Sequence, residues 1–370
     1  MVTVLIAGGG TGGHVFPMLA VGDALRAAEA RTRVVYVGTP RGIEGRAIGE
    51  RAGEELFLLD VAPLRGDGVR GFVRGVARAA GSLPEARALV KRLRPDVALS
   101  VGGYAGGPIA LAARMEGASV APLEPNSVLG LSNRLLTPFA ERAYVAFPEA
   151  ERYLRPSTVR RLGVPLRRAF APSDYTPGEG PLTLLVIGGS QGAKQFNEVL
   201  PRAVSIAVSS GADVRVTHQT GRDREEDVRA SYASHGLSER ARIVPFIDDM
   251  AAALAGADVI VSRAGAGALA EICAVGRASI LIPFPFAADQ HQYRNARSLE
   301  RAGAAVAVAP SDVSAERLSA EIVALAREPA RRARMAKAAE GLGRPDAAAR
   351  VARDLLDLAE GRAARAREAC

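Results

Sequence analysis

Short apolar runs that end near glycines alternate with helix-like segments along the first half of the chain. The runs cover residues 2–7, 33–38, 96–101 and 119–123, and residues 17–28 carry apolar side chains at helical spacing. Buried strands of parallel sheets are continuous apolar runs of this kind, and the helices between them form the crossover connections. The alternation therefore predicts βαβ units in a parallel sheet.

The same pattern starts again near residue 181 and predicts a second domain. The run at residues 181–187 leads into a second glycine-rich stretch. Later apolar runs lie at residues 214–217, 241–244, 258–262 and 279–283. We therefore predict two Rossmann-like, doubly wound α/β domains at residues 1–162 and 163–343. Residues 344–370 are expected to form a C-terminal helix that packs back on the first domain.

Composition narrows the class of protein. Apolar residues make up 48% of the 370 positions and charged residues 24%, which is ordinary for a globular protein that folds on its own core. No window approaches the ~18 continuous apolar residues of a membrane-spanning helix. Two cysteines are too few for a disulfide scaffold or a four-cysteine zinc site. We therefore expect a cytoplasmic protein.

The positive charge is unevenly distributed. Lysine and arginine number 48 against 40 acids, a net charge of +8. Residues 65–94 hold eight basic residues against Asp67 and Glu85, a net charge of +6 within this stretch. A local basic face favours an anionic partner such as nucleic acid, an acidic membrane surface or a phosphorylated substrate.

The first glycine-rich stretch, residues 8–14, satisfies the pattern G-x-G-x-x-G. Such a stretch lets a phosphate approach backbone N–H groups at a helix N-terminus. A dinucleotide site would also need an acid at the end of the second strand, and none occurs before Glu44. A turn without a ligand is another interpretation, although so many glycines carry a large conformational cost. His14 is either a general base or a helix-start histidine bonded to its own backbone.

Two further glycine-rich stretches lie in the second half of the chain. Residues 188–194 lack the Gly-Lys-Ser/Thr of a Walker A motif, but Ser190 and the N–H groups of the next helix can bind a phosphate. The alternative is an ordinary strand-to-helix turn. Residues 263–267 precede Glu271, whose carboxylate suits ribose hydroxyls or, more simply, the positive end of a helix dipole.

Two amides and one more glycine-rich edge complete the pattern. Gln292 and Asn295 lie three residues apart and share a helix face, either to bind sugar hydroxyls or as a solvated polar surface. Residues 102–108 end a strand and would join residues 8–14 at the carboxyl edge, where open α/β sheets bind ligands. The sequence has no nucleophile elbow and no carboxylate pair at a recognisable spacing. This favours direct transfer from a nucleotide-linked donor over covalent catalysis.

Seven stretches, in order along nearly the whole chain, resemble one protein family. They are residues 8–17 (GGGTGGHVFP), 102–108, 124–133 (EPNSVLGLSN), 188–193 (GGSQGA), 246–250 (FIDDM), 263–271 and 289–304. The ordered set is similar to the MurG family of bacterial peptidoglycan synthesis. These enzymes are UDP-N-acetylglucosamine–undecaprenyl-pyrophosphoryl-muramoylpentapeptide N-acetylglucosaminyltransferases.

The resemblance implies a GT-B fold, in which two doubly wound parallel-sheet domains face each other across a cleft. It implies an inverting transfer of N-acetylglucosamine from UDP-N-acetylglucosamine to the muramoyl 4-hydroxyl of lipid I, which gives lipid II. No cofactor and no metal fixed by the protein are implied, and divalent cations can assist. The implied donor residues are Phe246, Ile247 and Arg167 for the uracil, Glu271 for the ribose, Ser190, Gln191 and Gly192 for the diphosphate, Gln292, Asn295 and Asn126 for the sugar, and Ala266.

The resemblance assigns the acceptor to the first domain. His14 is the candidate general base, acting directly or through water. The residues implied to face the lipid acceptor are Thr11, Gly12, Gly13 and Tyr104.

A lipid acceptor suggests that the basic stretch at residues 65–94 binds a membrane surface. Read as an amphipathic helix, it forms an apolar patch ringed by cations that suits an anionic membrane surface, the alternative being a surface helix with its apolar side in the core. The residues of this patch are Arg70, Phe72, Val73, Arg74 and Val76. The resemblance therefore implies a peripheral protein at the cytoplasmic face of the inner membrane. Its expected partners are lipid I and the anionic membrane surface. Other peptidoglycan-synthesis and division proteins are compatible with this function, and no nucleic-acid partner is expected.

Three positions depart from the usual pattern of the family. Leu123 and Pro125 stand where histidine and glutamine are usual, which affects the hydrogen bonds around Asn126. Val164 stands where asparagine is usual, close to Arg167. The chain has no tryptophan, so membrane attachment would depend more on charge.

Other functions remain open on these residues. A related transferase could use another lipid or natural-product acceptor, whereas a UDP-sugar epimerase would need paired acids and histidines that we do not find. The arginine excess also permits a nucleotide- or nucleic-acid-binding protein without catalysis. Against that function, aromatic residues make up only 5% of the chain and no stacking or groove-reading motif occurs.

Overall fold

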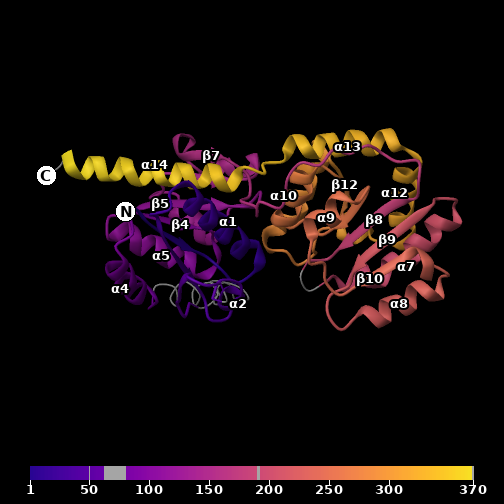
Figure 1. The fold of residues 1–370 in the computed structure, drawn as a ribbon, viewed down its shortest axis with the longest axis horizontal. Helices are drawn as coiled ribbons and strands as arrows, with labels where there is room; N and C mark the ends of the chain where they lie inside the picture. Colours follow the sequence, from indigo (N-terminus) through magenta and orange to yellow (C-terminus); the bar gives the residue numbers. More distant parts are fainter. Residues whose placement is uncertain (50, 62–80, 190–191, 369–370) are drawn as a thin grey trace. The chain divides into compact units, whose positions relative to one another are not determined.

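The computed structural model describes the chain except for residues 50, 62–80, 190–191 and 369–370 (Figure 1). The chain divides into two compact units. Unit 1 comprises Met1–Arg168 and Asp346–Cys370, and unit 2 comprises Ala169–Pro345. The divisions at 168 and 345 lie a few residues beyond the boundaries expected from the sequence at 162 and 343.

Among the described residues, unit 1 is built on a seven-stranded sheet whose strand pairs are all parallel. The strands are β1 (Thr3–Ala7), β2 (Arg33–Gly38), β3 (Glu55–Leu58), β4 (Val97–Ser100), β5 (Ser119–Glu124), β6 (Ala143–Val145) and β7 (Val159–Arg161). Their order across the sheet is β3-β2-β1-β4-β5-β6-β7. In the interior strand β1, Val4 lies opposite Val34 on β2 and opposite Val97 on β4.

Helices cover both faces of this sheet. They are α1 (Gly12–Ala28), α2 (Glu44–Ala47), α4 (Leu83–Leu93), α5 (Gly103–Met115), α6 (Leu131–Leu136) and α14 (Ala347–Glu368). Successive residues of β1 point to opposite faces, so Val4 and Ile6 pack with α1 and α14, while Leu5 and Ala7 pack with α4 and α5. The C-terminal helix α14 therefore completes the core of unit 1, and Figure 1 shows it running along this unit.

Helix α1 begins five residues before the helical pattern seen in the sequence. The pattern predicts a helix from residue 17, whereas α1 starts at Gly12 and contains Pro17. Thr11 precedes it in an extended conformation. Glycine is a weak helix former, so helix propensities do not predict a first turn that begins with Gly12 and Gly13. The start of α1 consequently follows the glycine-rich turn directly.

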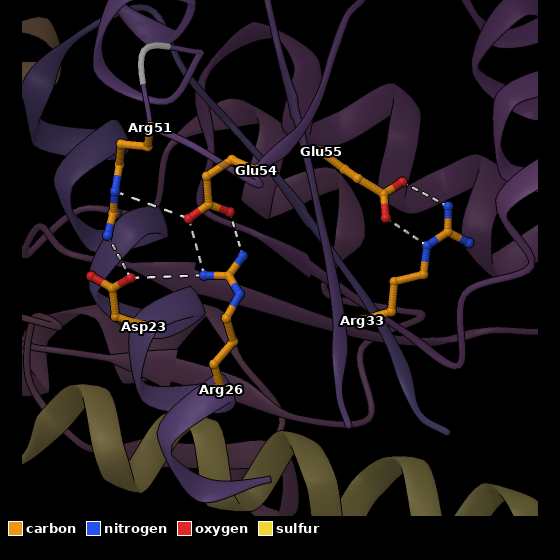
Figure 2. Close-up of polar contacts among 6 residues, drawn as sticks. All are labelled: Asp23, Arg26, Arg33, Arg51, Glu54 and Glu55. Atoms are coloured by element: carbon orange, nitrogen blue, oxygen red, sulfur yellow. Dashed lines mark hydrogen bonds and ion pairs between the residues drawn. The ribbon is translucent and has the colours of Figure 1, made fainter. Parts of the chain in front are cut away.

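Ion pairs connect α1 to the residues before β3 (Figure 2). Arg26 donates two hydrogen bonds to Glu54, whose side chain is only 6% exposed. Asp23 lies 3.8 Å from Arg26 and accepts a 2.8 Å hydrogen bond from Arg51. This network stabilises α1 against its neighbours and contains none of the candidate site residues.

Among the described residues, unit 2 is built on a six-stranded sheet of parallel pairs in the order β10-β9-β8-β11-β12-β13. The strands are β8 (Leu182–Ile187), β9 (Val214–Gln219), β10 (Ala241–Val244), β11 (Val259–Ser262), β12 (Ala278–Leu281) and β13 (Ala305–Ala307). The helices are α7 (Lys194–Ser209), α8 (Glu225–Ser234), α9 (Met250–Ala255), α10 (Ala266–Val275), α11 (His291–Arg301), α12 (Ala315–Arg327) and α13 (Pro329–Leu342). Leu184 and Val186 of β8 share a core with Phe196 and Leu200 of α7.

The strand order reverses beside the first strand of each sheet. The reversal lies between β1 and β4 in unit 1 and between β8 and β11 in unit 2. Open α/β sheets bind ligands outside the carboxyl ends of the strands at this switch point. In both units the loops that leave these strand ends are the glycine-rich stretches of the sequence.

Candidate functional site

The candidate residues of the first domain meet at the carboxyl ends of β1 and β4. Thr11 is exposed, and His14 is half-buried in the first turn of α1, after Gly12 and Gly13. A Cβ placed at Gly102, after β4, would lie 3.6 Å from His14 Nε2. The structure thus brings the two glycine-rich stretches of unit 1 together around His14.

Tyr104 lies at the same edge. It belongs to the first turn of α5 and is 36% exposed. A Cβ placed at Gly10 would lie 3.7 Å from Tyr104 Cε2, so the ring borders the turn before α1. Thr11, Tyr104 and His14 are therefore grouped as the sequence predicts for one ligand-binding edge.

A buried carboxylate holds Asn126, which follows the next strand, β5. Glu124 Oε1 accepts hydrogen bonds from the backbone N–H and from Nδ2 of Asn126, both at 3.1 Å. Glu124 Oε2 accepts from Gly130 N–H at 2.8 Å and from Asn133 Nδ2 at 3.2 Å. Burial raises the pKa of Glu124, and these hydrogen bonds oppose the rise. Four donors on one carboxyl group fix the Asn126 loop firmly.

The same network continues to the neighbour of His14. Ser100 Oγ donates to Asn133 Oδ1 at 3.0 Å and accepts from Gly102 N–H at 3.3 Å. Asn126 and His14 therefore border one connected edge. The sequence pattern by itself indicates no role for Asn133 or Ser100. The family stretch 124–133 contains Asn133 and was the available signal for it.

The departures from the family pattern are accommodated locally. Leu123 is buried in the core, and its carbonyl accepts a 2.9 Å hydrogen bond from Asn133 Nδ2. Asn126 therefore makes its hydrogen bonds to Glu124 even though Leu123 and Pro125 replace the usual histidine and glutamine. Arg167 falls in unit 1, where its guanidinium lies 5.5 Å from the centre of the Phe16 ring. Its contact with a uracil stays a prediction.

In unit 2, the loop after β8 is shaped by glycine at Gly192. This residue has φ +71°, and a Cβ there would lie 2.0 Å from the Thr220 carbonyl oxygen. Gly189 O accepts hydrogen bonds from Gly192 N–H at 2.9 Å and from Gln219 Nε2 at 3.0 Å. The predicted diphosphate residues Ser190 and Gln191 lie outside the described residues.

A buried histidine, His218, supports this loop through its neighbour Asn197. His218 Nε2 lies 3.1 Å from Asn197 Oδ1, and Nδ1 lies 3.1 Å from the Tyr232 hydroxyl. Asn197 Nδ2 donates to the Thr220 carbonyl at 3.1 Å, the same oxygen that Gly192 approaches. Because Asn197 Oδ1 can only accept, His218 Nε2 carries a proton and Nδ1 accepts from Tyr232. Burial lowers the pKa of His218 to about 4.

Protonation of His218 is expected to destabilise the protein in mild acid. The unfolded chain takes up a proton near the ordinary histidine pKa of 6.5, whereas the folded chain resists it until about 4. The unfolded state therefore binds more protons in this window. The free energy of unfolding should be fully present above pH 6.5 and fall as pH drops towards 4, by up to about 3 kcal/mol.

Denaturant unfolding at a series of pH values, followed by a probe in unit 2, measures this effect. The H218Q variant should lose this part of the pH dependence. The exposed His235 provides the matched control, since H235Q should keep it. An equal slope in H218Q and the wild type would show that another group is responsible.

Four further donor candidates follow the ends of two strands of unit 2, β10 and β11. Phe246, 52% exposed, and half-buried Ile247 follow β10. Ala266 is the first residue of α10, and half-buried Glu271 lies in its second turn, after β11. Together with Gly192 they line the carboxyl edge of the sheet, as expected for a ligand bound across it.

Gln292 and Asn295 contact protein backbone on the same side of α11. Gln292 Oε1 accepts a 2.9 Å hydrogen bond from Phe284 N–H. Asn295 is fully buried, and its Nδ2 donates to the Ala264 carbonyl at 3.2 Å. Both amides therefore hold the loops after β12 and β11 in this structure. Their contact with sugar hydroxyls stays a prediction.

Arg263 joins the loops of this edge and was not singled out from the sequence. Its Nη1 donates to Gln195 Oε1, Ile282 O and Pro283 O, each at 3.2 Å. Its guanidinium lies 4.5 Å from the centre of the Phe196 ring, and burial lowers its pKa. Arg263 begins the family stretch 263–271, which was the available signal for it in the sequence.

The predicted membrane-facing patch is not part of the described chain. Arg70, Phe72, Val73, Arg74 and Val76 lie within residues 62–80, outside the described residues. Only the C-terminal part of the basic stretch is described, on and around α4. None of the described helices is both long and apolar enough to cross a membrane. The described residues also contain no group of three His, Cys, Asp or Glu residues arranged to hold a metal ion.

Comparison with protein families gives two matches, one in each half of the chain. The glycosyltransferase family 28 N-terminal domain matches residues 4–145. The glycosyltransferase family 28 C-terminal domain matches residues 183–351. The two matches cover the two parallel sheets almost completely.

Individual relatives align along the full chain. A "UDP-N-acetylglucosamine--N-acetylmuramyl-(pentapeptide) pyrophosphoryl-undecaprenol N-acetylglucosamine transferase" from Sorangium cellulosum is 66% identical, with 100% of this chain and 95% of the relative covered. A protein of the same name from Acidithiobacillus ferrooxidans is 44% identical over 97% of this chain and 98% of its own. The crystal structure of Acinetobacter baumannii MurG is similar with a TM-score of 0.82 and 31% identity, covering 96% of this chain and 100% of that one.

Proposed function

This chain belongs to the MurG family of N-acetylglucosaminyltransferases, and we infer that it transfers N-acetylglucosamine from UDP-N-acetylglucosamine to the muramyl-pentapeptide on pyrophosphoryl-undecaprenol. The observation that carries this conclusion is 66% identity along the whole chain to a relative of that name. The chain is thus a UDP-sugar hexosyltransferase of peptidoglycan precursor synthesis, and it has the GT-B fold.

We propose that unit 2 binds the donor at the carboxyl edge of its sheet. The start of α7 after Gly192 would receive the diphosphate, because the first N–H groups of a helix attract anions. Phe246 and Ile247 would border the uracil, and Glu271 would accept hydrogen bonds from the ribose. The proposed contacts of the N-acetylglucosamine are Gln292 and Asn295, together with Asn126 of unit 1. Those of the diphosphate are Ser190 and Gln191.

We propose that unit 1 binds the acceptor around Thr11, Tyr104 and His14. The acceptor 4-hydroxyl oxygen attacks the anomeric carbon of the donor sugar and forms the new glycosidic bond. The bond from that carbon to the diphosphate oxygen breaks, and UDP leaves with the electron pair. His14 takes the hydroxyl proton, directly or through water. Helix N–H groups stabilise the negative charge that develops on UDP. One displacement of this kind inverts the anomeric centre.

The decisive experiment is transfer of labelled N-acetylglucosamine from its UDP donor to a short-chain lipid I analogue. We expect a disaccharide product with inverted anomeric configuration, made by the purified full-length chain. Tight donor binding without product would overturn the acceptor assignment and favour another acceptor for the same fold. Failure to bind the donor would overturn the function altogether.

The same function supports attachment to a membrane surface, since its acceptor is a membrane lipid. We propose that the basic stretch at residues 65–94 contacts anionic headgroups at the cytoplasmic face of the inner membrane. The support is its net charge of +6, eight basic residues less two acids, with apolar residues interspersed. Within the described part of this stretch, helix α4 exposes Arg87, Lys91 and Arg92.

Replacing two arginines of the basic stretch, Arg70 and Arg74, should weaken membrane binding measurably. Each basic residue near an anionic surface contributes about 1 kcal/mol, so R70A/R74A should lower partition onto vesicles of mixed anionic and zwitterionic lipid by about 30-fold. Added salt should reduce wild-type binding because it screens the attraction. The control variant R229A/R242A removes two exposed arginines of unit 2. Equal loss of binding in both variants would contradict a local surface.

A further inference from the structure

Glu44 is a buried acid that the proposed reaction has not used. It is the first residue of α2, and its side chain is fully buried. Its Oε1 accepts a 2.8 Å hydrogen bond from Gly10 N–H, 34 residues away in sequence. The same oxygen accepts from Thr39 N–H at 3.2 Å and from Thr39 Oγ1 at 3.4 Å. One carboxylate oxygen therefore ties the glycine turn before α1 to the loop after β2.

The space around Glu44 exists because three positions are glycine. A Cβ at Gly9 would lie 1.6 Å from Oε1, and a Cβ at Gly42 would lie 1.7 Å from Oε2. A Cβ at Gly38 would lie 2.7 Å from Cγ. The atoms that such a Cβ would overlap belong to the Glu44 side chain, so any side chain at these positions would displace its carboxyl group. This explains part of the unusual glycine content of this edge.

The opposite side of the same turn contacts the loop after β4. A Cβ at Gly103 would lie 2.4 Å from the carbonyl oxygen of Gly9, and Gly103 has φ +70°. Tyr104 borders Gly10, as described above. The turn is thus held between Glu44 and the residues that carry Tyr104 and border His14. A movement of the turn would carry Thr11 and the start of α1 with it.

The other oxygen of Glu44 is poorly satisfied for a buried carboxylate. Oε2 is buried and has no hydrogen-bond partner among the residues that the structure describes. A buried acid with an unpaired oxygen costs free energy, so it is a poor choice for stability alone. Such a cost at a ligand-binding edge is typical of a group that is needed for its position.

We propose that Glu44 is a positioning residue that fixes the turn at residues 8–11, and through it Thr11 and His14, for the acceptor. The inference rests on the proposed function, because it takes unit 1 as the acceptor side. We expect this role to require a side chain long enough to place a carboxyl or amide oxygen within hydrogen-bonding distance of Gly10 N–H. The negative charge of Glu44 is expected to matter less.

Three substitutions separate reach from charge. E44D keeps the charge but is one methylene shorter, so its oxygens fall short of Gly10 N–H. E44Q keeps the length and one oxygen acceptor while losing the charge, and E44A removes both. The matched control is E54A. Glu54 is another acid of unit 1, with a side chain 6% exposed, that pairs with Arg26 away from the site (Figure 2).

The test measures kcat and KM for each substrate of the full-length enzyme, together with hydrogen–deuterium exchange of a peptide covering residues 8–14. We expect E44A and E44D to lower kcat/KM for the lipid I analogue by about 10- to 100-fold, with donor KM within about twofold of wild type. Residues 8–14 should exchange faster in both variants. E44Q should restore most of the activity and the slow exchange, and E54A should leave both unchanged.

Several results would overturn the proposal. These are losses in E44D no larger than those in E54A, a donor KM that rises in step with the acceptor KM, or unchanged exchange of residues 8–14 in E44D. If E44A does not fold, the comparison of E44D with E44Q makes the same decision. A wild-type enzyme without transfer activity would overturn the proposed function instead, and the exchange measurement would still decide whether Glu44 holds the turn.

Discussion

Replacement of His14 by alanine is expected to lower kcat for transfer by about 10²- to 10⁴-fold, the usual contribution of a general base. The ring is half-buried in the first turn of α1 and borders Gly102 at the carboxyl edge of the unit 1 sheet. Without it, the acceptor hydroxyl must lose its proton to water while it attacks the anomeric carbon. The measurement is the initial rate of transfer to the lipid I analogue at saturating concentrations of both substrates.

The donor KM separates loss of the base from loss of the fold. H14A should bind UDP-N-acetylglucosamine as the wild type does, because the donor is assigned to unit 2. The exposed His235 on the same chain is the matched control, and H235A should retain full activity. Near-normal turnover in a correctly folded H14A enzyme would contradict the assignment of the base.

Replacement of Glu271 by alanine is expected to weaken donor binding by about 10- to 100-fold. Hydrogen bonds to a charged group contribute about 1.5–3 kcal/mol, and the ribose offers two hydroxyl donors to one carboxylate. Glu271 lies in the second turn of α10, next to the switch point of the unit 2 sheet. The measurement is the Kd of UDP for the wild type and E271A, by calorimetry.

A nucleotide without ribose hydroxyls makes this prediction specific. The 2′,3′-dideoxy analogue of UDP should bind the wild type and E271A with nearly equal affinity, because the contact is already missing. E226A, which removes an exposed acid of α8, should bind UDP normally. If E271A weakens both nucleotides equally, Glu271 acts through the local structure and does not contact the ribose.

The sequence predicted most strands of both sheets, including the edge strand β10, and missed four short ones. The predicted runs at residues 33–38 and 241–244 coincide with β2 and β10, and the other predicted strands differ by a few residues at their ends. The missed strands β3, β6, β7 and β13 have only three or four residues. Three of them lie at the ends of the sheets, where one side has no neighbour to bury an apolar run. The sequence VRR of β7, for example, contains no apolar pattern.

The candidate site was predicted as a set of loops, and its polar connections were not. Thr11, His14 and Tyr104 follow glycine-rich strand ends, so the parallel-sheet rule alone groups them. Glu44, Asn133 and the pair formed by His218 with Asn197 carry no comparable local pattern. Their hydrogen bonds join residues 34, 33 and 21 positions apart, so they depend on how strands and loops pack.

The sequence by itself determined the GT-B fold and the family. Apolar periodicity and glycine placement are local properties that are set before any packing occurs, and seven ordered stretches identified the MurG transferases, as the 66% identical relative confirms. Tertiary structure alone decided which side chains hold those stretches in shape. Glu44 reaches Gly10 only because glycines at three separate positions leave room for it. Such contacts depend on the final approach of distant backbone segments, which no local pattern along the chain encodes.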